Sequence, residues 1–177
     1  MIFLTVGTQL PFDRLVAAVD DWAALNPEVE LFGQIGAGDY KPLHFRHADY
    51  LTPEAADNHF RRASLIVSHA GMGSILTALK YRKSILMLPR RAALGEHRND
   101  HQLATAKWLG QRPGIVVAEE TADVGRLLDR RESFGGGDAI GDFAETGLIL
   151  RLQDFVSMRR EPGVEPSARG DAAKDAG

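Results

Sequence analysis

The clearest structural signal in this chain is Leu65-Ile-Val-Ser-His-Ala-Gly-Met-Gly-Ser-Ile-Leu-Thr-Ala-Leu79. Its first three residues form a short apolar run that predicts a buried strand. The loop Ser68–Ser74 then joins this strand directly to a helix. One face of that helix is marked by Met72, Ile75, Leu76 and Leu79. A strand that leads through a tight loop into a helix is the repeating unit of a parallel α/β sheet.

The same alternation continues in both directions from this stretch. Further strands are predicted at Ile2–Val6, Leu31–Ile35, Phe45–Leu51, Ile85–Leu88 and Ile115–Val117. Further helices are predicted at Phe12–Trp22, Pro53–Arg62, Leu103–Trp108 and Val124–Leu128. Short apolar strands that alternate with helices predict an α/β fold, in which helices cover both faces of a parallel sheet.

The chain is predicted to hold one domain and a tail. The domain covers residues 1–156 and ends in a helix from Ile140 to Val156, which Asp138 caps. Residues 157–177 are rich in Pro, Gly, Ala and mixed charges, so we expect a disordered C-terminal tail.

Composition excludes several classes of function. The 177 residues carry a net charge of −3, so no nucleic-acid partner is expected. The absence of cysteine excludes disulfides, thiolate metal sites and a cysteine nucleophile. The first apolar run is too short for a signal peptide, and no stretch approaches the roughly 20 apolar residues of a membrane-spanning helix. Work at a membrane would therefore need another component to bring the chain there.

In a parallel sheet, ligands bind at the carboxyl ends of the strands. The loop Ser68–Ser74 lies at such an end, and Gly71 and Gly73 allow the backbone to approach a ligand closely. The free amides at the start of the following helix favour an anion such as a diphosphate, and Ser74 adds a hydroxyl donor. The alternative is that the glycines only make a tight turn. A third glycine of the dinucleotide pattern is missing, and the sequence has no nucleoside-triphosphate phosphate loop.

Two other loops follow predicted strands. Gly7-Thr8-Gln9 either contacts the same phosphates from the other side or forms a simple turn. The loop from Arg90 to Gln102 is the most polar of the three. Its side chains suit a sugar nucleotide: Glu96 for vicinal hydroxyls, Asn99 and Gln102 as donors and acceptors, and Arg90 or Arg91 for a phosphate or a sugar carboxylate. The alternative is a solvated loop with a helix cap at Asn99 or Asp100.

The histidines of this loop raise the question of a metal. His97 and His101 have the spacing of two ligands on one helical face. Glu96, however, precedes the first histidine and does not follow it as in the zinc motif His-Glu-x-x-His. We therefore expect no metal and no cofactor.

Together the three loops resemble glycosyltransferase family 28, specifically its C-terminal, donor-binding half. The resemblance rests on Val6-Gly-Thr-Gln9 with Phe12-Asp13, on Ser68-His-Ala-Gly-Met-Gly-Ser-Ile75 and on Asp100-His-Gln102. The opening is similar to the soluble catalytic subunit of two-component UDP-sugar transferases. The stretch Pro89–Ala104 is similar to bacterial exopolysaccharide glycosyltransferase subunits. The resemblance covers residues 1 to about 130.

This resemblance implies a Rossmann-like domain equivalent to the C-terminal half of a GT-B enzyme, and metal-independent transfer from a UDP-sugar with inversion. It implies a polyprenyl-diphosphate-linked oligosaccharide acceptor, presented by a membrane-anchored partner subunit that recruits this cytoplasmic chain to the inner face of the membrane. Donor contacts are implied for Gly7, Thr8, Gln9, His69, Gly71, Met72, Gly73, Ser74, Glu96, Asn99, His101 and Gln102. Arg90 would add positive potential. Relatives often carry Glu where this chain has Thr77, which leaves the residue that holds the ribose open.

Within this interpretation, the helix start at Gly71–Ser74 meets the charge that develops on the departing UDP. The general base is expected in the partner, with His69 as a candidate in this chain. Two alternatives remain: a UDP-sugar epimerase fragment, which the chain length disfavours, and a non-catalytic subunit that binds nucleotide-sugar in a polysaccharide complex. Turnover in the presence of the partner separates the last from a transferase.

Overall fold

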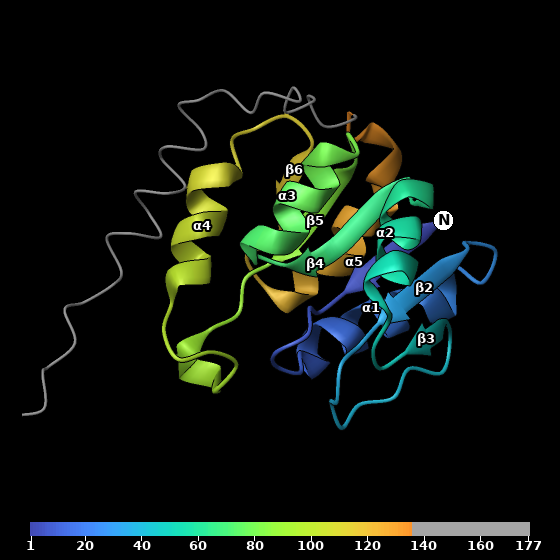
Figure 1. The fold of residues 1–177 in the computed structure, drawn as a ribbon, viewed down its shortest axis with the longest axis horizontal. Coiled ribbons are helices and arrows are strands. Elements are labelled where there is room, and N and C mark those ends of the chain that lie inside the picture. The colour runs from blue at the N-terminus through green and yellow to red at the C-terminus, as the bar shows by residue number, and fades with distance from the viewer. Residues whose placement is uncertain (136–177) are drawn as a thin grey trace, which may run out of the picture. The chain divides into compact units, whose positions relative to one another are not determined.

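The computed structural model describes residues 1–135, which form one parallel sheet with helices on both sides (Figure 1). The strand order is β3-β2-β1-β4-β5-β6. The strands are β1 (Ile2–Thr5), β2 (Leu31–Gln34), β3 (Arg46–Ala48), β4 (Leu65–His69), β5 (Ser84–Leu88) and β6 (Ile115–Val117). The α-helices are α1 (Asp13–Leu25), α2 (Pro53–Arg62), α3 (Met72–Lys80), α4 (His101–Leu109) and α5 (Thr121–Asp129). Two 3-10 turns, η1 (Ala92–Leu94) and η2 (Arg131–Ser133), complete these elements. The predicted fold class is confirmed.

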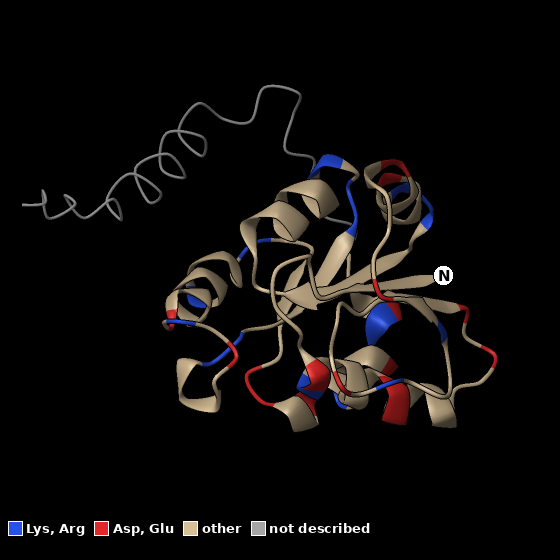
Figure 2. Cartoon of the chain, turned by 60° about the horizontal axis from the view of Figure 1, so that its bottom comes forward, with Lys and Arg blue, Asp and Glu red and all other residues tan. Residues whose placement is uncertain are grey.

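Three of the four inner strands, β1, β4 and β5, are almost entirely buried. They contain no Asp, Glu, Lys or Arg, so the middle of the sheet carries no charged side chain in Figure 2. Ile2 of β1 lies opposite Leu31 of β2 on one side and Leu65 of β4 on the other. Alternate residues of the strands enter two separate cores. Ile2 and its same-face neighbours pack with α1 and α5, whereas Phe3 and its same-face neighbours pack with α2, α3 and α4. Both faces of the sheet are therefore covered, as a parallel sheet requires.

Local sequence signals explain where several helices begin. Asp13 lies in the first turn of α1, where a carboxylate is favoured by the helix dipole. Helix α2 begins with Pro53, and the hydroxyl of Thr52 accepts a hydrogen bond of 3.2 Å from the Ala55 amide. Helix α5 begins with a capping box between Glu120 and Asp123.

Three details differ from the sequence-based expectation. The third strand is confined to Arg46–Ala48, inside the predicted range Phe45–Leu51. Leu76 does not share the buried face of α3 and is 40% exposed. In α4 the large apolar side chains Leu103 and Trp108 are exposed, while Gln102 and Thr105 are buried. The last difference has a tertiary cause: the Gln102 side chain accepts a hydrogen bond from the Arg90 amide, and Ala106 and Leu109 on the same side of the helix join the core.

Four predictions concern residues 136–177 and lie outside the described residues. They are the cap at Asp138, the helix from Ile140 to Val156, the domain boundary at residue 156 and the C-terminal tail. Among residues 1–135, no helix is long and apolar enough to cross a membrane.

Candidate functional site

A cavity of about 500 Å³ opens at the carboxyl ends of β1 and β4. These two strands are neighbours, but the chain runs outward from β1 through β2 and β3 before it returns to β4. The connections on the two sides of the pair therefore diverge and leave a crevice between them. Ligands of open α/β sheets bind at such a topological switch point.

The first wall of the cavity is the loop that follows β1. Gly7 has a φ of +79°, a left-handed conformation that favours glycine. Its carbonyl accepts a hydrogen bond of 3.1 Å from the Gln34 side chain, and its amide donates to the Thr5 hydroxyl at 3.2 Å. Thr8 and Gln9 follow on this wall and are exposed. The loop thus presents two polar side chains to the cavity from a backbone held at its start.

The second wall is the glycine loop between β4 and α3. Gly71 is the N-cap residue of α3 and provides no side-chain cap for the first turn. A Cβ on Gly71 would lie 2.1 Å from Nε2 of His69, so a larger residue does not fit there. At Gly73 a Cβ would meet nothing within 4 Å, and the residue lines the cavity. Helix α3 therefore directs an uncapped amino terminus, with little side-chain bulk, at the cavity. This arrangement suits an anion.

His69 lies between the first two walls, close to both Gly7 and Gly71. The Ser68 hydroxyl donates to the Thr5 carbonyl at 2.8 Å and lies 3.2 Å from Nδ1 of His69. Because the hydroxyl proton is engaged, the Ser68 oxygen accepts from a protonated Nδ1, which leaves Nε2 as an acceptor. Burial lowers the pKa of His69 to about 4, and the charge of Arg90 acts in the same direction. His69 is therefore neutral at pH 7.

The third wall comes from Arg90, the loop after it and the start of α4. Arg90 is 2% exposed, and burial lowers its pKa to about 10, so the side chain stays charged at pH 7. Its guanidinium donates to the carbonyls of Val6, Leu10 and Pro11 at 2.7–2.8 Å and stacks over the Phe12 ring, 4.8 Å from its centroid. Arg90 thus supports the first wall through its backbone. Its hydrogen-bonding capacity is largely used within the protein.

The remaining side chains of this wall are His97, His101 and Gln102. The rings of His97 and His101 pack edge to face, with centroids 4.3 Å apart. Within residues 1–135, no group of three or more His, Cys, Asp or Glu residues is placed to hold a metal ion. None of the described residues that line the cavity is an aspartate or a glutamate. The cavity therefore combines one buried cation, three imidazoles and a helix amino terminus without an opposing carboxylate.

Most of the predicted donor-binding residues come together in this cavity. Those that line it are Gly7, Thr8, Gln9, His69, Gly71, Met72, Gly73, Ser74, Arg90, His101 and Gln102. Glu96 and Asn99 do not line it. The Glu96 carboxylate instead forms a two-point ion pair with Arg14, at 2.7 Å for both contacts. The Asn99 side-chain oxygen contacts Nδ1 of His101, next to the cavity.

Several lining residues were not predicted. Gln34 ends β2, and its place at the carboxyl end of a predicted strand was the available signal. An apolar slot between α2 and α3 also belongs to the cavity. Its residues are Leu51, Pro53, Ala56, Phe60, Met72 and Thr77. The Thr77 hydroxyl donates to the Gly73 carbonyl at 2.8 Å, so its proton is used within the helix. Only Met72 and Thr77 of this slot drew attention in the sequence as site residues, because the slot forms only when residues from the start of α2 and from α3 meet in the folded chain.

Fold and cavity define a Rossmann-like domain of the kind that forms the C-terminal half of GT-B glycosyltransferases. A model of the glycosyltransferase family 28 C-terminal domain matches residues 1–129. The chain belongs to this family.

Two curated relatives are similar in sequence. The chain is 32% identical over 119 residues to the human (Homo sapiens) UDP-N-acetylglucosamine transferase subunit ALG13. It is also 32% identical over 117 residues to the mouse (Mus musculus) protein of that name. These matches cover 61% and 60% of this chain but 10% of each relative. The chain therefore corresponds to a small part of those proteins.

Solved structures agree on the fold. A solution structure of ALG13 superposes with a TM-score of 0.59 at 17% identity, and the match covers 86% of this chain and 94% of that chain. Acinetobacter baumannii MurG gives a TM-score of 0.54 at 18% identity, covering 86% of this chain and 49% of that chain. At such low identity these structures show the fold alone. The part of the MurG chain that matches is about half of it, as expected for one of two GT-B domains.

Proposed function

We propose that this chain is the donor-binding catalytic subunit of an inverting, metal-independent UDP-sugar glycosyltransferase. It transfers a hexosyl group to a polyprenyl-diphosphate-linked acceptor in bacterial exopolysaccharide synthesis. A membrane-associated partner supplies the acceptor domain and recruits this chain from the cytoplasm. The supporting observation is the cavity at the ends of β1 and β4, which the amino terminus of α3 faces and which no Asp or Glu of residues 1–135 lines.

The walls divide the donor between them. The diphosphate lies against the amino terminus of α3 and the loop Gly7–Gln9, where amides and the charge of Arg90 favour an anion. The acceptor hydroxyl attacks the anomeric carbon while the bond from that carbon to the diphosphate breaks. The charge that develops on UDP is stabilised by dipoles already in place, which is commonly a large part of catalysis. The acceptor proton passes to a base.

The partner is the better source of that base. His69 presents Nε2 as an acceptor, but a pKa of about 4 makes it a weak proton acceptor near neutral pH. No Asp or Glu among the described residues lines the cavity. His69 instead accepts a hydrogen bond from the donor or from the acceptor hydroxyl. The word "subunit" in the name of the ALG13 relatives supports a two-chain enzyme.

The test is thermal unfolding of the purified chain with UDP, GDP, ADP and NAD at equal millimolar concentration. A ligand present at about 100 times its dissociation constant adds roughly 2.7 kcal/mol to the free energy of unfolding. Stabilisation by UDP above the others is expected. Stabilisation by NAD or ADP instead would contradict the proposal.

The second candidate is a non-catalytic subunit that binds nucleotide-sugar in a polysaccharide complex, since the same cavity would serve it. The two functions differ in turnover. The chain is co-expressed with the acceptor-domain protein, and UDP release is measured with a lipid-linked acceptor. A Gly73→Trp variant, which fills the cavity, is the negative control. UDP release that this variant abolishes identifies the transferase. Binding of UDP-sugar without turnover identifies the non-catalytic subunit.

A further inference from the structure

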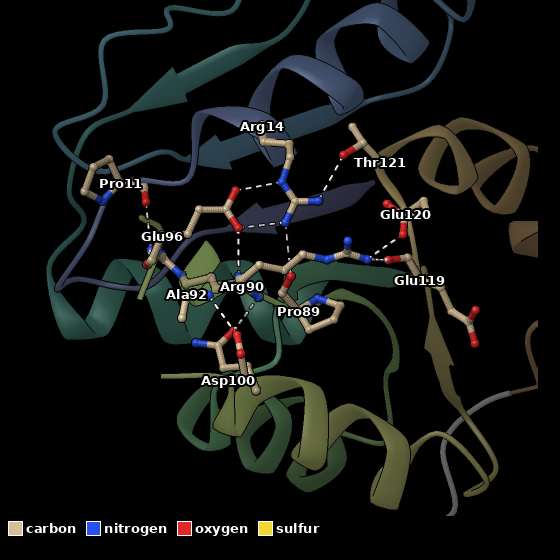
Figure 3. A network of polar contacts seen from close by, with 12 residues as sticks. Pro11, Arg14, Pro89, Arg90, Ala92, Glu96, Asp100, Glu119, Glu120 and Thr121 are labelled. Carbon is tan, nitrogen blue, oxygen red and sulfur yellow. Dashed lines mark hydrogen bonds and ion pairs between the residues drawn. The ribbon is translucent and has the colours of Figure 1, made fainter. Parts of the chain in front are cut away.

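The loop between β5 and α4 is held by a partly buried polar network (Figure 3). At its centre, Arg14 of α1 meets Glu96 of the loop: Nε donates to Oε1 and Nη2 donates to Oε2, each at 2.7 Å. The two side chains are only 19% and 12% exposed, so solvent screens their charges poorly. A two-point arginine–carboxylate pair fixes orientation as well as distance.

Further bonds connect this pair to the start of the loop and to helix α5. Arg14 also donates to the Pro89 carbonyl at 3.2 Å and to the Thr121 hydroxyl at 3.0 Å. The Glu96 carboxylate accepts a third hydrogen bond, from the Arg91 amide at 2.9 Å. The start of the loop is thereby tied to its middle, and both are tied to α1 and to the beginning of α5.

A second connection runs from the loop to the first wall of the cavity. The Arg90 guanidinium donates to the Leu10 and Pro11 carbonyls, and also to the Glu96 carbonyl at 3.4 Å. The residue after Glu96 is His97, which lines the cavity. A shift of Glu96 would therefore affect two walls of the cavity: the first wall through Arg90, and the third wall through His97. Neither Glu96 nor Arg14 itself lines the cavity.

We propose that Glu96 is a positioning residue, which Arg14 holds in place so that the loop 90–100 presents His97, and the start of α4 that follows it presents His101, to the nucleotide-sugar. This inference rests on the proposed function. It replaces the expectation that the Glu96 carboxylate binds sugar hydroxyls, because that carboxylate already accepts three hydrogen bonds from the protein. Arg14, which no motif singles out, becomes as important for donor binding as Glu96.

The experiment compares the full chain with Glu96→Gln, Arg14→Lys and the double variant. The matched control is Asp49→Asn, which removes one carboxylate from the exposed Lys41–Asp49 ion pair. Two quantities are measured for each protein: the dissociation constant for UDP-glucose and UDP, and the imidazole signals in long-range ¹H–¹⁵N spectra without ligand. The imidazole signals report the loop directly and do not require that a nucleotide binds.

In the two single variants, the signals of His97 and His101 shift, while those of the exposed histidines His44 and His47 keep their positions. Each single variant binds UDP-glucose with a dissociation constant roughly fivefold higher than that of the unchanged chain. The double variant has a dissociation constant no higher than that of the weaker-binding single variant, because both substitutions break the same interaction. Asp49→Asn matches the unchanged chain in both measurements.

Two results overturn the inference. One is that the His97 and His101 signals keep their positions in both single variants. The other is that Glu96→Gln loses affinity for UDP-glucose while Arg14→Lys keeps it, which would make Glu96 a direct sugar ligand. A chain that binds neither UDP nor UDP-glucose contradicts the proposed function instead, and the imidazole signals then decide the inference alone.

Discussion

At the scale of single residues, the contact between Gly71 and His69 makes a sharp prediction. A Cβ on Gly71 would lie 2.1 Å from Nε2 of His69, and Ser68 holds the other ring nitrogen. Gly71→Ala should therefore displace the ring and lower the free energy of unfolding by about 1–3 kcal/mol, as overpacking does. The measurement is urea unfolding followed by circular dichroism.

The matched control is Gly73→Ala, two residues along the same loop. A Cβ at this position meets nothing within 4 Å, and alanine is the better helix former in the first turn of α3. Its stability should equal or exceed that of the unchanged chain. If both variants lose the same free energy of unfolding, the close approach to His69 does not explain the loss in Gly71→Ala.

His69 also predicts a pH dependence of stability. Its pKa in the folded chain is about 4, below the ordinary value of 6.5, mainly because of burial. Between pH 6.5 and pH 4, the imidazole of His69 is protonated in the unfolded chain but neutral in the folded chain. The stabilising contribution of the neutral ring is therefore fully present above pH 6.5 and is lost as the pH falls toward 4. Up to about 3 kcal/mol is lost between pH 6.5 and 4. Urea unfolding of the chain and of His69→Gln should give stability curves that converge toward pH 4. Parallel curves would contradict the assignment.

Single residues also show which parts of the site can be predicted from the sequence and which cannot. The glycine loop and Gly7–Gln9 were predicted to line the site because their positions follow from strand ends, and they line the cavity. Glu96 was predicted as a sugar ligand because a carboxylate in a polar loop suits hydroxyl groups. Its partner Arg14 is 82 positions away in the chain, and only tertiary packing brings the two together. For the same reason, the several backbone carbonyls that Arg90 contacts could not be anticipated.

At the scale of elements, helix α1 anchors the connection between β2 and β3 through Asp20. This carboxylate is 1% exposed and accepts hydrogen bonds from the amides of Leu43 and His44, at 2.8–3.1 Å, and from the Tyr40 hydroxyl at 2.8 Å. Burial opposes its ionisation, but these donors outweigh burial and lower the pKa of Asp20 below 3.8. Its stabilising contribution is therefore present above pH 3.8 and lost as the pH falls further.

Asp20→Asn should lower the free energy of unfolding by about 2–4 kcal/mol. The reason is that the side-chain NH₂ group of asparagine would face the backbone amides and the hydroxyl that now donate to the buried carboxylate. The exposed neighbour provides the control, since Asp21→Asn removes a charge at the surface of the same helix. Chemical denaturation at pH 7 compares the two. A loss below about 0.5 kcal/mol for Asp20→Asn, which is the usual range of surface changes, would show that the connection is held by other contacts.

Elements differ in how well the sequence predicts them. The strands β1, β4 and β5 are continuous apolar runs, and their burial on both faces follows from that pattern. Helix α4 shows the opposite case. Its buried side combines the polar Gln102 and Thr105 with Ala106 and Leu109, while the larger apolar residues Leu103 and Trp108 are exposed. The largest apolar residues therefore do not mark the face that packs. This orientation combines core packing of Ala106 and Leu109 with the bond between Gln102 and Arg90, which connects the helix to the cavity.

At the scale of the whole molecule, the proposed function makes the cavity one side of a site. It offers groups that stabilise an anion but no carboxylate base among the described lining residues, and its neutral His69 is a weak base. The family model that matches residues 1–129 describes a C-terminal domain. An acceptor-binding domain that faces this cavity would supply the missing base, so the chemistry and the family membership both favour a second component.

A truncation tests how this second component is held. The predicted helix from Ile140 to Val156 carries Leu148, Leu150, Leu152 and Phe155, which spread over more than one helical face and suit a partner interface. Both apolar cores of residues 1–135 are built by the elements from β1 to η2 and the adjoining Phe134. A chain that lacks residues 140–177 should therefore stay folded and bind UDP, yet fail to co-purify with the acceptor-domain protein when the two are co-expressed. If the folded truncated chain still co-purifies, the partner contacts residues 1–139, and the exposed side chains Leu103 and Trp108 of α4 become the next positions to substitute.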